Sequence, residues 1–338
     1  MLKVVNYTFS FGGKIMNCYR EKYVEDRSEI MGATEILLEY VKQNESGFKP
    51  LENISEIERI QENFSKKEFE IVVTGDSKVG KSTFINKLVN KNVLPTSPTK
   101  VITYIKHCNH TYSIEGTKIH LKNGEIITID NEKLTELSES DLSEVEHLEI
   151  FLNSSFLKEG VVIIDTPSIA ALSEVQEENI NTKIKKASAH IFLCSAEQVG
   201  RKAETEFLYD KRDFRDQTLL IANKMDLINP EEEEDVIDVL ISNFSLETSE
   251  LLFLISTSDD DNPVITVKQQ LDQMLFGNDH LKNKIGVAFK SIARNYALLV
   301  KENLLKTPEE LEDYIFLEKI DDKLKELIKK GINNREKE

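Results

Sequence analysis

FEIVVTGDSKVGKST, residues 69–83, is the stretch of this 338-residue chain that decides the fold. Residues 70–74 are mostly apolar and β-branched, and they predict a buried strand. The loop that follows is bounded by Gly75 and Gly80, and apolar residues at helical spacing come after it between 84 and 89. A strand, a glycine-bounded loop and a helix in this order are the context of a phosphate-binding P-loop.

Each residue type in this loop suits a bound triphosphate. Gly75 and Gly80 let the backbone curl so that its N–H groups, with the helix N-terminus, hold phosphate oxygens. Lys81 would reach the β- and γ-phosphates as a mobile point charge, and Ser82 would give its hydroxyl to Mg²⁺. The predicted nucleotide-binding residues of the loop are Gly75, Asp76, Ser77, Lys78, Val79, Gly80, Lys81, Ser82 and Thr83.

The segment DTPS, residues 165–168, follows a continuous apolar run and supplies a second part of the predicted site. Asp165 suits a magnesium ion reached through a water molecule, although an ordinary strand-end turn explains it equally well. Ser168 stands where the DxxG motif has glycine. Its backbone N–H can still reach a γ-phosphate, but serine resists positive φ. We hypothesise that this restricts the movement of the segment and slows hydrolysis.

The segment NKMD, residues 223–226, follows another apolar run and predicts a guanine reader. Asp226 can accept hydrogen bonds from the ring N–H and the exocyclic amino group of guanine, a donor pair that adenine lacks. The alkyl stem of Lys224 can cover the base, and Asn223 can brace neighbouring loops. Finally, Ser256 and Thr257 follow the apolar run 252–255, where a backbone N–H can meet the guanine carbonyl oxygen.

These four motifs each come directly after a strand-like run. The carboxyl ends of parallel strands meet at one edge of an open α/β sheet, which is where such sheets bind ligands. The order of the motifs therefore predicts an α/β P-loop domain with the phosphate loop and the guanine reader at one sheet edge.

The stretch NVLPTSPTKVIT, residues 92–103, looks like the switch I segment of bacterial dynamin-like proteins. The insertion after it, with strand-like segments around Asn123-Gly124, is longer than small Ras-like GTPases allow. The resemblance covers about residues 50–305. It implies a dynamin-type GTPase domain, a mostly parallel central sheet flanked by helices, over residues 68–277. A mainly helical N-terminal extension (1–67) and C-terminal helices (278–338) would form an adjoining bundle.

The resemblance also implies roles for single residues. Thr99 is the first choice for the switch threonine, whose hydroxyl would bind Mg²⁺ and whose backbone would sense the γ-phosphate. Thr103 is second and Thr96 third. Lys78 stands where the family commonly has a small polar residue such as serine. We hypothesise that its ammonium replaces the monovalent cation that some members use, and a solvated loop lysine is the alternative. The predicted catalytic set is Lys81, Thr99 and Lys78, with Ser82, Thr99 and Asp165 serving the metal.

Periodicity outside the motifs predicts further elements. Apolar stripes indicate helices over 25–43, 50–64 and 279–305, and a helix with a capping-box start follows at 307. A short strand and turn are expected within residues 1–20, and an acidic helical stretch over 131–143. The Asn123-Gly124 pair between two strand-like segments favours a type I′ hairpin.

Composition limits the classes of function. The chain has 43 basic and 60 acidic side chains, a net charge of −17, which argues against nonspecific binding to nucleic acid or to an anionic membrane. The cysteines at 18, 108 and 194 are odd in number and far apart, so a reducing cytoplasm is the simplest context. No apolar run approaches the roughly 20 residues of a membrane-spanning helix.

Three readings of the function follow. We expect a GTPase that uses GTP/GDP and Mg²⁺, forms a homodimer through its GTPase domain, and couples turnover to membrane or partner remodelling. Peripheral membrane association and a stalk-bearing partner are implied by the resemblance alone. A nucleotide-gated binding switch with little hydrolysis is the alternative, suggested by Ser168. A ribosome-associated GTPase is disfavoured by the acidic composition, and no nucleic-acid partner is expected.

Overall fold

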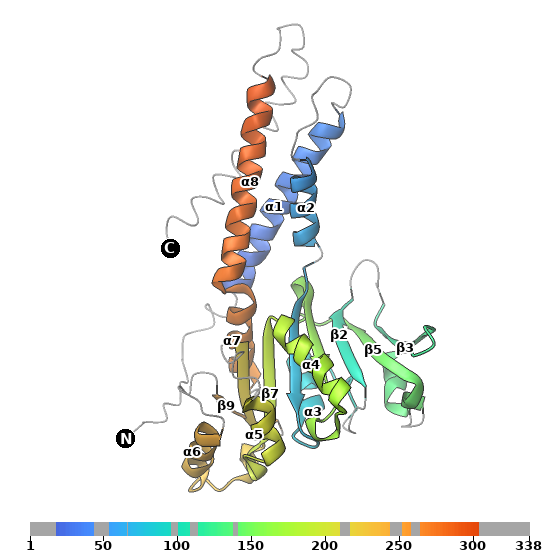
Figure 1. Ribbon diagram of the computed structural model, residues 1–338, viewed down its shortest axis with the longest axis vertical. Helices are drawn as coiled ribbons and strands as arrows, with labels where there is room; N and C mark the ends of the chain where they lie inside the picture. Colours follow the sequence, from blue (N-terminus) through green and yellow to red (C-terminus); the bar gives the residue numbers. More distant parts are fainter. Residues whose placement is uncertain are drawn as a thin grey trace. The chain divides into compact units, whose positions relative to one another are not determined.

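The computed structural model of the chain describes residues 18–43, 54–65, 67–95, 101–108, 114–137, 141–209, 217–243, 252–257 and 264–303. They form two compact units (Figure 1). One consists of the described parts of Met1–Lys67 and Phe276–Glu338, and the other of those of Glu68–Leu275. The second unit holds all four nucleotide motifs.

The motif-bearing unit is built on a mixed sheet whose nine strands, in the described part of the chain, have the order β4-β3-β5-β2-β6-β1-β7-β8-β9. The strands are β1 Phe69–Gly75, β2 Ile102–His107, β3 Gly116–Leu121, β4 Ile126–Ile129, β5 Val145–Leu152, β6 Val161–Asp165, β7 Ala189–Ser195, β8 Thr218–Asn223 and β9 Leu252–Leu254. Figure 1 shows the strands of this sheet side by side, with β9 and β7 toward one end of the sheet and β5 and β3 toward the other.

The sheet has a parallel half and a mixed half. β1 runs parallel to its neighbours β6 and β7, and β8 and β9 continue the parallel half. On the other side of β6, β2 is antiparallel to β6 but parallel to β5, while β3 is antiparallel to both β5 and β4. This arrangement confirms the predicted α/β fold with a mostly parallel central sheet.

Helices bury both faces of the parallel half, and for this reason its strands are continuous apolar runs. The helices are α3 Lys81–Val89, α4 Glu174–Lys186, α5 Lys202–Tyr209, α6 Glu233–Asn243 and α7 Val264–Phe276. One core cluster joins strands β1, β6, β7 and β8 to α4, α5 and α6; it includes Val72, Ile164, Phe192, Leu220, Ile180, Ile184, Phe207 and Leu240. Each such buried side chain stabilises the fold by about 1.5–3 kcal/mol.

The β3–β4 hairpin forms where it is expected, but its turn differs from the prediction. A type I′ turn needs positive φ at both central residues, and only Gly124 has it, with φ 88°. The N–H of Gly124 donates to the carbonyl of Leu121 at 2.9 Å, and the N–H of Leu121 donates to the carbonyl of Glu125 at 2.9 Å. The loop is therefore a three-residue connection that ends in a left-handed glycine, and the predicted type I′ turn is wrong. Likewise, two short 3₁₀ helices, Asn131–Glu136 and Asp141–Glu144, replace the expected acidic helix.

The other unit is helical. α1 Cys18–Gln43 packs against both α2 Ile54–Ser65 and α8 Asp279–Asn303. The Nε of Arg27 on α1 donates to the carbonyl of Phe64 on α2 at 2.8 Å, and the Ser291 hydroxyl of α8 donates to Glu56 of α2 at 2.7 Å. The predicted bundle of N- and C-terminal helices is thus confirmed for these three, with α1 starting seven residues earlier than expected.

Two expected elements, the strand near the N-terminus and the helix after residue 307, fall outside the described residues. Every helix in the described part of the chain is too short or too polar to cross a lipid bilayer.

Asn86 offers a test of the fold near the P-loop. This buried α3 residue accepts the N–H groups of Val93 and Leu94 at 3.1 and 3.0 Å and donates to the Leu94 carbonyl at 2.9 Å. We expect Asn86→Ala to lower the free energy of unfolding by about 2–3 kcal/mol in urea titration, because it leaves backbone groups unsatisfied. The control is Asn90→Gly, since Asn90 is exposed with φ 55° and glycine adopts that conformation readily. Equal effects of the two substitutions would contradict this stabilising role of the Asn86 side chain.

Candidate nucleotide-binding site

The P-loop runs from the end of β1 to the start of α3, and its curl depends on three residues with positive φ. These are Gly75 at 151°, Lys78 at 62° and Gly80 at 96°. A Cβ on Gly75 would lie 2.2 Å from the carbonyl oxygen of Leu193, and one on Gly80 would lie 2.4 Å from the side-chain nitrogen of Asn223. Both glycines are therefore required by close approach as well as by conformation.

Lys81, the first residue of α3, folds its side chain back over the loop. Its Nζ donates to the carbonyl oxygens of Gly75 at 2.9 Å and of Asp76 at 2.8 Å. Burial lowers the pKa of Lys81, while the negative charges of Asp165 and Asp76 oppose that shift. The ammonium is thus held against the backbone of the loop by two carbonyl oxygens. Ser82 and Thr83 follow in the first helical turn and are half-buried.

Asn223 connects three of the predicted segments through one side chain. It is fully buried at the end of β8. Its Nδ2 donates to the carbonyl of Val79 in the P-loop at 2.9 Å and to the hydroxyl of Thr257 at 3.1 Å. Its Oδ1 accepts the N–H of Thr257 at 3.0 Å. The structure therefore brings the P-loop, the NKMD segment and the Ser256-Thr257 loop together.

The rest of the NKMD segment is held by the same neighbouring loop. The N–H of Asp226 donates to the Ser256 hydroxyl at 2.9 Å. The carboxylate-bearing residue itself is exposed, so a bound base could reach it. Lys224 has φ 66°, and its Nζ lies 3.2 Å from the carboxylate of Glu197, a residue that the sequence did not single out.

Asp165 ends β6 and is fully buried beside the P-loop strand, where it lies opposite Val73 in β1. On its other side it lies opposite Thr103 of β2. Thr103, the second choice for the switch threonine, is also fully buried, and its hydroxyl has no hydrogen-bond partner within the described residues. Thr96 and Thr99 lie outside the described residues, so the choice of Thr99 stays a prediction.

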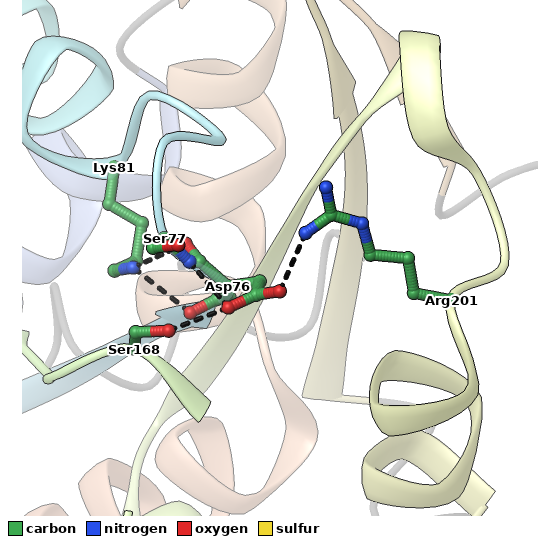
Figure 2. A network of polar contacts seen from close by, with 6 residues as sticks. Asp76, Ser77, Lys81, Ser168 and Arg201 are labelled. Carbon is green, nitrogen blue, oxygen red and sulfur yellow. Dashed lines mark hydrogen bonds and ion pairs between the residues drawn. The ribbon is translucent and has the colours of Figure 1, made fainter. Parts of the chain in front are cut away.

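Asp76 is the centre of a polar network that the sequence did not reveal (Figure 2). Its Oδ1 accepts the N–H of Ser77 and the hydroxyl of Ser168, both at 2.6 Å. Its Oδ2 lies 2.8 Å from a guanidinium nitrogen of Arg201. Burial alone would raise the pKa of Asp76, but the bonds from Ser168, Ser77 and Arg201 hold it below its ordinary value of 3.8. The carboxylate is therefore ionised at neutral pH.

Ser168 thereby connects two parts of the site. Its φ is −57°, so it does not use the positive φ open to the glycine of a DxxG motif. Its hydroxyl, absent in glycine, bonds the P-loop aspartate. Lys78 is exposed, and no hydrogen bond or ion pair of its ammonium is found within the described residues. Its role in place of a cation remains a prediction.

Glu204, on α5, is a second carboxylate near this network. It is 1% exposed and accepts the backbone N–H of Arg201, as a residue in the first helical turn can. Burial raises its pKa to about 7; Arg201 opposes the shift and the nearby Asp76 adds to it. No short motif marks Glu204 or Arg201, because their contacts come from different elements of the fold.

The residues present fit a nucleoside triphosphate with Mg²⁺. The positive-φ loop, the glycine contacts and the Lys81 ammonium form a cradle for phosphates. The oxygens of Ser82 and Asp165 are ligands that magnesium prefers, directly or through water.

Comparison with known proteins identifies relatives of this chain. Residues 71–225 match the family model described as "Dynamin family". The chain is 25% identical over 247 residues to a "Bacterial dynamin-like protein" of Nostoc punctiforme, covering 64% of this chain and 35% of that protein. It is 21% identical over 248 residues to "Dynamin-like protein A" of Bacillus subtilis, covering 71% and 20%. An uncharacterised protein of Caldicellulosiruptor is 27% identical over 185 residues, covering 53% and 45%.

A solved structure of an oligomerised bacterial dynamin pair has the same fold. It superposes with a TM-score of 0.59 at 17% sequence identity, over 86% of this chain and 58% of that one. The matched part of this chain spans less than half the length of each of the three curated relatives named above.

The buried Glu204 predicts a pH dependence of stability. Its pKa is raised in the folded state, so the folded protein holds this proton more tightly than the unfolded chain. The free energy of unfolding should fall as pH rises from about 4.5 to about 7, at up to about 1.4 kcal/mol per pH unit. Glu204→Gln should flatten this slope in urea titrations. Glu206→Gln, on the same helix but exposed, should leave it unchanged; an unaltered slope in the Glu204 variant would show that another group is responsible.

Proposed function

This chain is a member of the dynamin-like GTPase family, and from that premise we propose that it binds GTP and hydrolyses it to GDP and phosphate. The observation that carries the proposal is the buried Asn223 amide, which bonds the P-loop and the Ser256-Thr257 loop at once. This geometry supports a single ligand served by Lys81 at its phosphate end and by Asp226 at its base.

Different residues of the site would bind the phosphates and hold the metal ion. The backbone N–H groups of the P-loop and the ammonium of Lys81 hold the phosphates. Ser82, Asp165 through water, and Thr99 would hold Mg²⁺, which neutralises charge on the phosphate oxygens when bound. Hydrolysis then depends mainly on positioning a water molecule and stabilising charge, as in other phosphoryl transfers. Lys78 would supply the positive charge of a monovalent cation, so turnover should not depend on exchanging potassium for choline.

Asp226 provides the test of base selection. We expect the native chain to bind GTP far more tightly than ATP in calorimetry. Asp226→Asn should lower GTP affinity by about 100-fold, because the amide cannot accept both guanine donors. The same variant should gain affinity for xanthosine triphosphate, whose base carries an oxygen in place of the amino group. Equal binding of ATP and GTP by the native chain would refute the proposed guanine specificity.

A nucleotide-gated switch with little turnover is the second candidate, and the hydrogen bond from Ser168 to Asp76 favours it. This bond ties the DTPS segment to the P-loop and can restrain its movement.

Two substitutions at Ser168 distinguish the effect of its backbone conformation from the effect of its hydroxyl. Ser168→Ala removes only the bond to Asp76, whereas Ser168→Gly removes the bond and also permits positive φ. If the segment is restrained, phosphate release should rise in both variants and most in the glycine one. Unchanged turnover in both would remove the argument for restraint.

Self-association and membrane remodelling are further parts of the proposal. The solved structure that shares this fold is of an oligomerised bacterial dynamin pair, which is described as a mechanism for the long-range sensing and tethering of membranes. This description supports self-association and membrane association as parts of the proposal. We propose a homodimer through the GTPase domain and peripheral association with a membrane or with a stalk-bearing partner. Phosphate release per molecule should rise with protein concentration, and particle size should increase with GTP and liposomes. A flat rate and an unchanged size would contradict assembly.

A further inference from the structure

Three hydrogen-bond donors from three parts of the chain converge on the carboxylate of Asp76. They are the N–H of Ser77 in the P-loop, the hydroxyl of Ser168 after β6, and the guanidinium of Arg201 before α5 (Figure 2). Such a set of neutral and cationic donors is also what a phosphate oxygen requires. The Asp76 carboxylate thus occupies a place suited to an anion.

The neighbours of Asp76 locate Arg201 within the nucleotide site. The carbonyl oxygen of Asp76 accepts a hydrogen bond from Lys81 at 2.8 Å. The sequence predicts that Lys81 and the backbone N–H of Ser168 both reach the γ-phosphate. Arg201 bonds the residue that lies between them, so it stands at the γ-phosphate end of the site.

Arg201 has a fixed backbone and a side chain that can move. Its carbonyl accepts the N–H groups of Glu204 and Thr205 at 2.9 and 3.0 Å, which anchors it at the start of α5. Its side chain is 42% exposed, whereas that of Asp76 is 8% exposed. The guanidinium has five N–H donors in a planar fork that matches a phosphate group.

Releasing Arg201 would not leave Asp76 without partners. The bonds from Ser77 and Ser168 both go to Oδ1, whereas Arg201 contacts Oδ2. A γ-phosphate carries more negative charge than a carboxylate, so it competes well for the same guanidinium. The ion pair with Asp76 is therefore a resting position of Arg201, from which its guanidinium can move to the γ-phosphate.

We propose that Arg201 is a catalytic arginine supplied within the chain, which leaves Asp76 and binds the γ-phosphate of GTP during hydrolysis. This inference rests on the proposed GTPase function. In that reaction the water oxygen bonds to the γ-phosphorus and the bond to the bridging oxygen breaks. The electron pair leaves on GDP, and the proton of the water goes to the released phosphate or to solvent. Arg201 keeps its protons throughout and stabilises the negative charge that develops.

The experiment compares the full chain with Arg201→Ala and Arg201→Lys. Catalytic arginines in phosphoryl transfer contribute about 1,000-fold or more to turnover, so we expect kcat of Arg201→Ala to fall at least about 100-fold. The affinity for GDP should stay nearly unchanged, and the complex with GDP and aluminium fluoride should be lost. Arg201→Lys should recover only part of the activity, since lysine lacks the planar fork.

Lys202→Ala is the matched control. Lys202 is the next residue, carries the same charge and is 87% exposed in an ion pair with Glu206. This variant should hydrolyse GTP like the native chain. Thermal midpoints of all variants, followed by circular dichroism, should agree, which excludes a loss of fold as the cause.

Each outcome decides the proposal. If Arg201→Ala keeps native turnover, or binds GDP and aluminium fluoride as the native chain does, Arg201 is not catalytic while the GTPase function stands. If its GDP affinity and thermal midpoint fall together with kcat, its role is structural and the proposal is wrong. If the native chain binds no guanine nucleotide, both the GTPase function and the role of Arg201 fail. If the native chain binds but scarcely hydrolyses GTP, the proposal still requires Arg201→Ala to bind GTP more weakly than the native chain does, with its affinity for GDP unchanged.

Discussion

The candidate site depends on one buried amide. Asn223 uses its donor and its acceptor at the same time, and both of its partners are loops that have little structure of their own. The close approach of Gly80 to this amide explains why no side chain fits at that loop position. Because buried amides must be satisfied, the three loops hold one another in place. The phosphate end and the base end of the site are therefore a single unit in structural terms.

Much of the fold could be predicted because each motif is local. The P-loop, the DTPS segment and the NKMD segment each follow an apolar run, and parallel strands align their carboxyl ends. Strand β7 carries no motif and was not predicted, although AHIFLCS, residues 189–195, is mostly apolar and every one of its residues is buried. The hairpin turn was predicted wrongly because the sequence Asn-Gly fits two turn types, and the backbone register around Leu121 decided between them. The contact between Asp76 and Arg201 could not be predicted from the sequence, for a different reason. Arg201 is 125 residues from its partner, and only the packing of α5 against the sheet brings the two together.

Asp76 and Ser168 show how one substitution can change the character of a site. A glycine at 168 would bring flexibility and no side chain. The serine brings a hydroxyl that bonds the P-loop, so the segment after β6 and the phosphate loop share a carboxylate. Arg201 bonds the other oxygen, so that carboxylate accepts bonds from three parts of the chain at once. The negative charge of Asp76 also contributes to the raised pKa of the nearby Glu204.

The antiparallel pairing of β2 with β6 has a mechanical consequence. Because β2 runs opposite to β6, the chain enters it at the same sheet edge where β1 and β6 end, beside the phosphate loop. β2 pairs with β5 along its whole length on one side, and with β6 over residues 103–105 on the other. A pull along its axis at that entry would load many hydrogen bonds in shear together, whereas a pull on a hairpin end would peel them apart one at a time. β2 can therefore transmit force, with little deformation, from the edge beside the phosphate loop to the opposite edge of the sheet.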